Sequence, residues 1–218
     1  MKHPRLPLSF ANYQRLYRVI LTVLNSVDAH TAHACKFFAI AGAYILSKTH
    51  GLEASPRFGS AFYRVNDTSG FVMSFTDIES LQRNELDSHP EAFHAWIECE
   101  DVIIDLLAPL FRENLLSLQP DSKLRLPRKM FQKQISQMAP SPFNLVKEGD
   151  FYLAVNPALT NEMIMDFTSR NMNTDLSEIC RHWYKPTPKA IPPQLEIGSD
   201  DGIRTIMNLD TTELVGKW

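Results

Sequence analysis

The chain has 218 residues, of which 44% are hydrophobic and 22% are charged, a composition typical of a globular protein. That length fits one domain with a substantial core. Its formal net charge of -3 gives no electrostatic basis for binding nucleic acid or an anionic membrane surface, so we expect neither as a partner.

The number of cysteines and the distribution of apolar residues indicate the cellular compartment in which the protein is expected. The three cysteines, Cys35, Cys99 and Cys180, are odd in number and widely spaced, which argues against a disulfide framework. The segment from Met1 to Leu8 lacks the apolar core of a signal peptide, and no apolar run is long enough to span a bilayer. We therefore expect a cytoplasmic protein. The sparse glycines form no phosphate-binding motif, and we expect no cofactor.

Two helices are expected at the start of the chain. Residues 9–26 carry apolar side chains at helical spacing, which predicts an amphipathic helix. A second helix should begin near Thr31 and continue to Leu46, with Gly51 as its stop. This second helix is apolar on most sides, so we expect it in the core.

The hydrophobic pattern then changes to that of a sheet. The ranges that predict strands are 57–65, 71–75, 93–99 and 102–106. Only Glu100 and Asp101 separate the last two, which should therefore form a hairpin. Residues 77–88 are polar and predict a short helix or a loop.

Beyond Pro109 the pattern is weaker. Basic residues between Lys123 and Lys133 suggest a solvated helix face. Residues 185–193 form a proline-rich linker that should be extended, and residues 194–218 should form a tail or a strand. The remaining predictions are a strand at 151–155 and helices at 161–171 and 176–184.

Cys35 is the first candidate functional residue because it lies at the expected N-terminus of the second helix. Unpaired backbone N–H groups and the helix dipole favour an anion there, which lowers the pKa of a thiol. The same N–H groups can stabilise an oxyanion during acyl transfer. Because free cysteines are among the most buried residues, an inert core cysteine is the alternative.

The hairpin supplies a possible base for this thiol. With a two-residue turn, one face of the hairpin carries His94, Trp96, Glu98, Ile103 and Asp105. His94 and Asp105 are then diagonal neighbours, roughly 7 Å apart at Cα and within reach of an imidazole–carboxylate hydrogen bond. Asp105 is flanked by apolar residues and is costly to bury without a partner. Together with Cys35, these two residues form a candidate catalytic triad.

The order of these residues resembles the transglutaminase-like superfamily. There a cysteine opens a helix, a strand reads His-Ala-Trp-x-Glu and an aspartate follows on the next strand. The corresponding segments here are Cys35, His94–Glu98 and Ile104–Pro109, and Gly51–Gly59 resembles the stretch that enters the sheet. The resemblance covers about residues 28–110. It implies a papain-like cysteine-protease fold, related to arylamine N-acetyltransferases and shared by bacterial families with this core.

Two features depart from that pattern. Lys36 follows the nucleophile, where an aromatic residue is common, and the link between the histidine and the aspartate is short. Asn25, His30 and His33 precede the nucleophile and could supply the second oxyanion donor, with Asn25 and His30 preferred. Trp96 shares the face of the histidine, should pack beside it and is a candidate substrate contact.

Two other functions stay open at this point. His30, His33 and Cys35 could bind a metal with a fourth ligand from His89 or His94, although their spacing matches no established structural zinc pattern. Alternatively, the chain is a non-catalytic binding module of the same fold. Tightly bound zinc would favour the first, and equal, slow alkylation of all cysteines would favour the second.

We expect a single α+β domain over residues 1–218, with a papain/transglutaminase-like core in which a central helix packs on an antiparallel sheet. The core should lie at about 28–110, followed by a helical and strand elaboration at 111–184 and the linker and tail at 185–218. The expected function is cysteine-dependent acyl transfer, with amide or peptide hydrolysis preferred over transfer to an amine or from a thioester. The expected partner is a peptide, amide or thioester substrate, without a metal.

Overall fold

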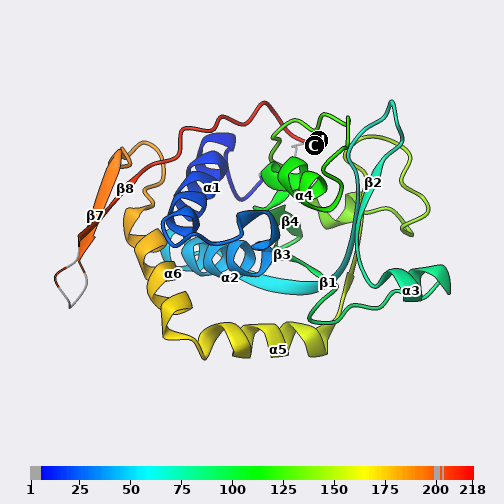
Figure 1. The fold of residues 1–218 in the computed structure, drawn as a ribbon, viewed down its shortest axis with the longest axis horizontal. Coiled ribbons are helices and arrows are strands. Elements are labelled where there is room, and N and C mark those ends of the chain that lie inside the picture. The colour runs from blue at the N-terminus through cyan, green and yellow to red at the C-terminus, as the bar shows by residue number, and fades with distance from the viewer. Residues whose placement is uncertain (1–5, 199–201, 203) are drawn as a thin grey trace.

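A long, bent strand, β1 (Ala54–Arg64), organises the computed structural model, which describes residues 6–198, 202 and 204–218 (Figure 1). The strand changes partners along its length, because its first half pairs with β3 and its second half with β2 and β6. All pairings in this sheet are antiparallel, and its main path runs β2-β1-β3-β4-β5. The other strands of this sheet are β2 (Val72–Phe75), β3 (His94–Cys99), β4 (Val102–Asp105), β5 (Phe131–Gln134) and β6 (Phe151–Val155).

Helices α1, α2 and α6 pack against one another beside the sheet, and α2 contacts both β1 and β3. The α-helices are α1 (Phe10–Asn25), α2 (Cys35–Ile45), α3 (Ile78–Gln82), α4 (Phe111–Leu118), α5 (Pro157–Thr168) and α6 (Asn171–Trp183). Shorter helical turns are η1 (Thr31–His33), η2 (Leu46–His50), η3 (Ala108–Leu110) and η4 (Ile135–Gln137). This arrangement confirms the expected α+β class with a helix on an antiparallel sheet.

Helix α2 is buried because its residues are apolar on most sides, and it approaches the sheet closely at Gly42. A methyl group on Gly42 would overlap the side chains of Leu106 and Ile97. The helix starts later than expected, because η1 is followed by a break at Ala34 and the α-helix begins only at Cys35. At the other end, Gly51 adopts a φ of +66°, which favours glycine, and stops the helix as predicted.

The hairpin of β3 and β4 has the register that a two-residue turn requires. Cys99 pairs with Val102 and Glu98 with Ile103. Because side chains alternate along each strand, the two faces join different hydrophobic cores. Ala95, Ile97, Cys99, Val102 and Ile104 face the core around α1 and α2, whereas Trp96 and Ile103 face a second core. Glu98 also forms an ion pair with Arg57 of β1, whose Nε lies 2.7 Å from Glu98 Oε2.

The region beyond α4 differs from the expectation. The basic residues from Lys123 to Lys133 do not form a helix face, since residues 119–130 contain no helix and Lys133 lies on β5. Pro120 and Pro127 remove backbone donors that a helix would need. Strand β5 forms instead by pairing with the free edge of β4.

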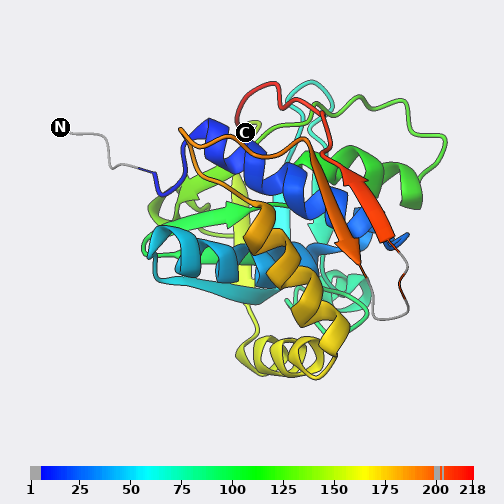
Figure 2. The same ribbon diagram turned by 90° about the vertical axis from the view of Figure 1, so that its left-hand side faces the viewer.

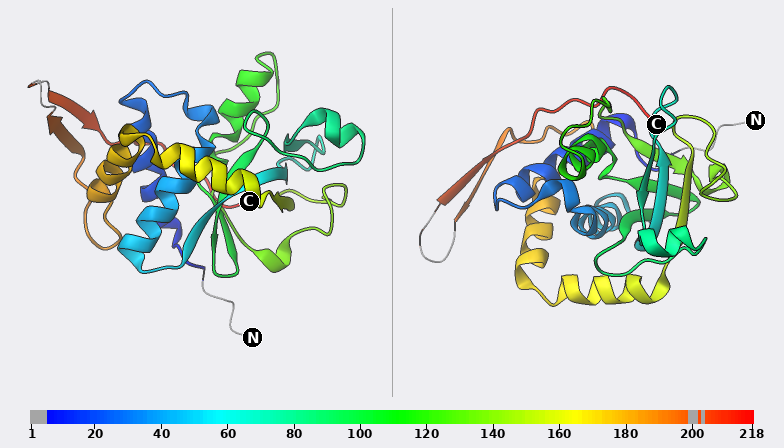
Figure 3. Two further views of the ribbon diagram at one scale, coloured as in Figure 1. Left: turned by 90° about the horizontal axis from the view of Figure 1, so that it is seen from below. Right: turned by 45° about the vertical axis from the view of Figure 1, so that its right-hand side comes forward.

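A separate hairpin of β7 (Gln194–Gly198) and β8 (Arg204–Asn208) projects from the body of the protein (Figures 2 and 3). Residues 185–193 contain a turn but no helix or strand, and Arg15 of α1 donates to the backbone carbonyl of Lys185. The final residues cross α1 and return to the sheet, where Trp218 donates to the carbonyl of Met130.

None of the helices formed by residues 6–198, 202 and 204–218 combines the length and the apolar character required to cross a bilayer.

Candidate active site

Cys35 is the first residue of α2, so the backbone N–H groups of the first helical turn lack intrahelical partners around it. The preceding residue, Ala34, has no side chain that could cap them. Only 6% of Cys35 is exposed. The packing of α2 on β3 brings this helix end toward the first residue of β3, which is His94.

His94 and Asp105 are paired and completely buried. His94 Nε2 lies 2.8 Å from Asp105 Oδ2, which is the hydrogen bond that the hairpin register predicts. The other carboxylate oxygen, Oδ1, accepts a hydrogen bond of 2.9 Å from the backbone N–H of Leu107. The hydroxyl of Tyr13 on α1 donates to the backbone carbonyl of Asp105. The aspartate is therefore held at three atoms, and its carboxylate fixes the orientation of the imidazole.

The pair keeps the imidazole charged. Complete burial disfavours the imidazolium, but the charge of Asp105, the hydrogen bond to it and the nearby Cys35 outweigh burial and raise the pKa of His94 to about 10. The remaining ring nitrogen, Nδ1, is buried and has no hydrogen-bond partner among the described residues. The thiol thus lies close enough to influence the ring without forming an aligned hydrogen bond, as is common before a substrate binds.

Aromatic side chains pack around the imidazole of His94. Phe75 stacks on the ring of His94 with centroids 4.3 Å apart, and Tyr63 meets it edge-on at 5.6 Å. Phe111 of α4 lies at 6.2 Å. Burial, followed by the charge of Asp105, raises the pKa of Tyr63 well above its usual value, so this side chain stays a neutral phenol. These rings restrict the motion of the imidazole and exclude water from its pairing with Asp105.

A cavity of about 220 Å³ opens beside the thiol and the imidazole; we call it the inner cavity. It is lined by His33, Cys35, Phe75, Pro90, Glu91, Phe93, His94, Leu107 and Asn114. A second space of about 550 Å³, the outer cavity, adjoins it and shares five of these residues. The residues that line only the outer cavity are Ser74, Thr76, Asp77, Ile78, Glu79, His89, Ala92 and Leu118.

Asn114 on α4 is a site residue that sequence reasoning missed. Its side chain is 3% exposed, and its Nδ2 donates to the carbonyl of Ala32 at 3.0 Å. Its Oδ1 is buried and has no partner in the described part of the chain. A signal was present in the sequence, because Asn114 is a polar residue on the apolar stripe of Phe111 and Leu115.

Comparison with known proteins places the chain in a family. The family described as "Protein of unknown function (DUF2026)" matches residues 9–218. The chain belongs to this family. It is also similar to a solved structure described as "The crystal structure of genomics APC5867", with 30% identity, a TM-score of 0.85 and complete coverage of both chains. No match was found among curated proteins.

The three tentative contacts lie away from the cavities of this DUF2026 protein. Asn25 at the end of α1 and His30 in the following loop are exposed, and neither lines the inner or the outer cavity. Trp96 is completely buried in the second core and is likewise absent from both cavity walls. Of the three residues that precede the nucleophile, only His33 lines both cavities, and its Nε2 lies 2.9 Å from Ser117 Oγ.

The suggested metal site lacks a suitable donor set in the DUF2026 chain. The rings of His30 and His33 are adjacent, with centroids 5.0 Å apart. Within the residues that the structure describes, no group of three or more histidine, cysteine or acidic side chains is arranged to hold a metal ion. The geometry therefore does not support a site built on these histidines and Cys35.

The other two cysteines have surroundings of a different kind. Cys99 and Cys180 are fully buried, and burial is the main cause that raises the pKa of each thiol. Neither lines the inner or the outer cavity. In this DUF2026 protein, Cys35 is thus the cysteine that combines a helix N-terminus, a neighbouring imidazole and a cavity.

Proposed function

We propose that this protein is a cysteine-dependent acyl-transfer enzyme that hydrolyses amide or peptide bonds through a Cys35–His94–Asp105 triad. The observation that carries the proposal is the orientation of the buried imidazole. Its Nε2 is bonded to Asp105, while its unpartnered Nδ1 and the Cys35 thiol lie beside the same cavity. A nucleophile, a base and a group that orients the base are the parts that acyl transfer by a thiol requires.

Each side chain would have a defined role. The raised pKa of His94 keeps its ring protonated near neutral pH, and a protonated imidazole stabilises a neighbouring thiolate. The thiolate attacks the carbonyl carbon, forming a C–S bond, and His94 gives its proton to the departing amine. Water then attacks the acyl-enzyme and loses a proton to His94, the C–S bond breaks, and the carboxylic acid leaves while the thiolate–imidazolium pair is restored.

The start of α2 would stabilise the oxyanion. In the tetrahedral intermediate the carbonyl oxygen carries negative charge, which backbone N–H groups at a helix N-terminus can bind. The break at Ala34 leaves the N–H of Cys35 without an intrahelical acceptor. Asn114 does not supply a second donor here, because its Nδ2 lies 3.0 Å from the carbonyl of Ala32 and 3.5 Å from His33 Nδ1, which account for its two N–H groups.

The arrangement of elements supports a papain/transglutaminase-like core in this proposal. A helix that begins with the nucleophile packs on an antiparallel sheet, and neighbouring strands of that sheet carry the histidine and the aspartate. This spatial order agrees with the sequence resemblance over about residues 28–110. We further propose a peptide, amide or thioester as the substrate and the cytoplasm as the compartment, where thiols stay reduced.

The pH dependence of Cys35 alkylation tests the proposal. The rate with iodoacetamide is measured from pH 5 to pH 10 by mass spectrometry of the Cys35 peptide, for the native chain and for His94→Ala. We expect a reactive thiolate near neutrality in the native chain, and a rise only near the ordinary thiol pKa of about 8.5 in the variant. Identical profiles in the two proteins would refute the ion pair. Cys180 in the same digests is the internal control, because it is buried far from a charged partner.

A further inference from the structure

The outer cavity has an excess of negative charge. Its wall carries Asp77, Glu79 and Glu91, and Glu91 also lines the inner cavity beside the nucleophile. Hydrogen bonds from Ser80 hold the pKa of Asp77 below its usual value, so this group is ionised at neutral pH. Among the described residues that line the two cavities there is no lysine or arginine, and the charge of the protonated His94 is balanced by Asp105 at 2.8 Å.

The histidines of the wall do not offset these carboxylates. His33 and His89 are the other titratable groups that line the outer cavity besides the acidic residues. Burial, assisted by His30, lowers the pKa of His33 and favours its neutral form. His89 Nε2 lies 3.7 Å from Asp77 Oδ1, so a protonated His89 would screen only that carboxylate. Glu79 and Glu91 are exposed and have no ion-pair partner among the described residues.

The unpaired acceptor Asn114 Oδ1 also favours a ligand that carries hydrogen-bond donors. Asn114 lines both cavities, and the carbonyl of Ala32 fixes its amide orientation because that oxygen can only accept. The orientation leaves Oδ1 free, and a buried acceptor without a donor is costly. A ligand that donates an N–H to Oδ1 would remove this cost, whereas a carboxylate in the same place would be repelled.

Apart from Ser74 and Thr76, the remaining walls of the outer cavity are apolar. Phe75 and Phe93 line both cavities, and Ile78 and Leu118 line the outer one with 67% and 70% of their surface exposed. Such surfaces suit the aliphatic part of a ligand, as where the methylene groups of a long amine lie along apolar side chains. The negative charge of the outer cavity, the unpaired Asn114 Oδ1 and the apolar walls together favour one kind of ligand. This ligand is a chain of methylene groups that ends in an amine.

We propose that the two cavities select an acyl substrate with a cationic amine, seated over Asp77, Glu79 and Glu91 while an N–H of the substrate donates to Asn114 Oδ1. This inference rests on the proposed function, since it assigns a substrate class to the site of Cys35. A peptide with a lysine-like or free amino group next to the scissile bond has this chemistry. Substrates with a carboxylate in that position are rejected.

Charged thiol reagents of matched size test the selection. Three methanethiosulfonates are used at pH 8: the cationic ethylammonium, the neutral methyl and the anionic ethylsulfonate reagent. For each, the rate at which Cys35 forms a mixed disulfide is divided by the rate at which free mercaptoethanol does so. We expect the ratio of the rate with the cationic reagent to the rate with the anionic reagent to be at least ten times larger for Cys35 of the native chain than for free mercaptoethanol. Each of Glu91→Gln, Glu79→Gln and Asp77→Asn should lower it about threefold, and 0.3 M salt should compress it.

Glu53→Gln is the matched control, because Glu53 precedes Ala54, which pairs with Cys99 at the end of β3 opposite His94. That places it roughly 17 Å along the strands from the site. The ratio should be the native one in this variant. Each ratio compares reagents on one preparation, so a partly unfolded variant does not distort it.

A ratio equal to that of the free thiol, or one that the three variants leave unchanged, would overturn the inference. This failure is distinct from failure of the proposed function. If charge selection is absent but iodoacetamide alkylation of Cys35 still depends on His94, only the inferred substrate class is refuted. If alkylation of Cys35 does not depend on His94, the proposed triad itself is refuted.

Discussion

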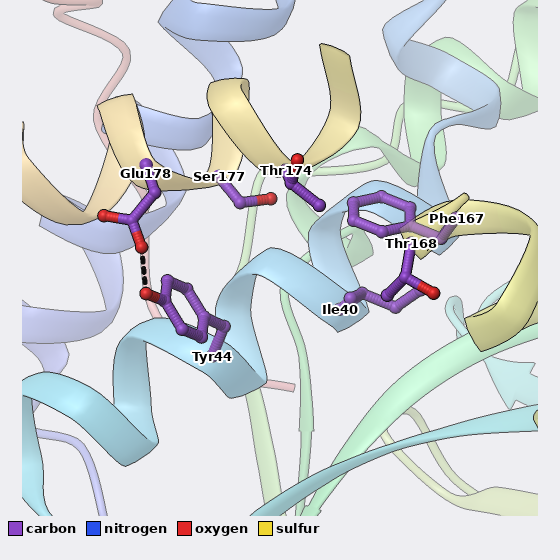
Figure 4. A pocket seen from close by; sticks show the side chains of 7 residues that line it. All are labelled: Ile40, Tyr44, Phe167, Thr168, Thr174, Ser177 and Glu178. Carbon is purple, nitrogen blue, oxygen red and sulfur yellow. Dashed lines mark hydrogen bonds between the residues drawn. The ribbon is translucent and has the colours of Figure 1, made fainter. Parts of the chain in front are cut away.

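Two of the cavities that helix α2 borders differ sharply, one at its N-terminus and one along the side that faces α5 and α6. The second is shown in Figure 4 and has a volume of about 330 Å³, compared with about 220 Å³ for the inner cavity. Its walls include Ile40 and Phe167, and its polar side chains have partners, since the Tyr44 hydroxyl donates to the Glu178 carboxylate. The hydroxyls of Thr168, Thr174 and Ser177 donate to backbone carbonyls of their own helices. At the inner cavity, His94 Nδ1 and Asn114 Oδ1 lack partners instead.

The difference shows that volume alone does not identify a site. Both cavities border the same helix and lie near apolar core, but of the two only the inner cavity retains buried polar atoms without a hydrogen-bond partner among the described residues. A stable fold rarely leaves such atoms buried, because each costs free energy comparable to a lost hydrogen bond. The following experiments compare the two regions, in order of decreasing expected effect.

Cys35→Ala should abolish acyl-transfer activity, because the nucleophile is removed. Hydrolysis of amine-bearing peptide amides should fall at least 10³-fold. The fold should remain, as judged by circular dichroism, since alanine suits the start of a helix. Cys180→Ala, which changes a buried cysteine of α6, should keep native turnover in its folded fraction. Full turnover by the Cys35 variant on a genuine substrate would exclude the mechanism.

His94→Ala should lower the alkylation rate of Cys35 at pH 7 by about 10²-fold, because the thiolate loses its cationic partner. Stopped assays with iodoacetamide measure this directly. The matched control, His50→Ala, removes an imidazole at the end of η2 that bonds to Tyr184 rather than to a thiol and lines neither the inner nor the outer cavity. An equal loss of rate in both variants would point to general loosening of the fold instead of an ion pair.

Asp105→Asn should destabilise the protein by about 3 kcal/mol, because it breaks a buried charge pair while leaving the shape unchanged. Urea unfolding measures the loss. The amide can still accept from Leu107, so the turn after β4 should persist. Its effect on alkylation should be smaller than that of His94→Ala. A variant as stable as the native protein would mean that His94 is neutral in the fold.

The stability should also depend on pH through His94. Its folded pKa of about 10 lies above the ordinary value of about 6.5. A raised pKa stabilises the fold fully below the ordinary value, and this contribution is lost as the pH rises toward 10. The urea midpoint of the native chain should therefore fall more between pH 6 and pH 9.5 than that of His94→Ala. Parallel falls would contradict the raised pKa.

Tyr44→Phe at the second cavity should have the smallest effect. It removes one partly exposed hydrogen bond to Glu178 and should cost about 1 kcal/mol or less. Cys35 alkylation should keep its native rate and pH dependence. A change in Cys35 reactivity would show that the two cavities communicate through α2.

The local elements could be predicted because periodicity and turn chemistry decide them. The pairing of Cys99 with Val102 follows from a two-residue turn, and with it the meeting of His94 and Asp105. The helix that carries Cys35 follows equally from its apolar run and Gly51. These features depend on residues that are near one another in the sequence.

The features that failed depend on distant packing. Asn25 and His30 were preferred as oxyanion donors because they precede the nucleophile in the chain, but both point to the exterior as exposed residues. Asn114 reaches the cavity from α4, through a contact between α4 and η1 that no local pattern encodes. Strand β5 is likewise defined by its pairing with β4 and not by its own polar sequence.

The contacts that hold Asp105 in place have a consequence for the synthesis of the protein on the ribosome. Tyr13 donates to the backbone carbonyl of Asp105, and Asp105 pairs with Phe131 of β5, so segments that precede and follow Asp105 in the chain both hold it. A nascent polypeptide that has emerged only as far as residue 110 lacks β5 and cannot secure the carboxylate. If the proposed triad operates, Cys35 should therefore become reactive only late in translation, after β5 has been synthesised and has paired with β4.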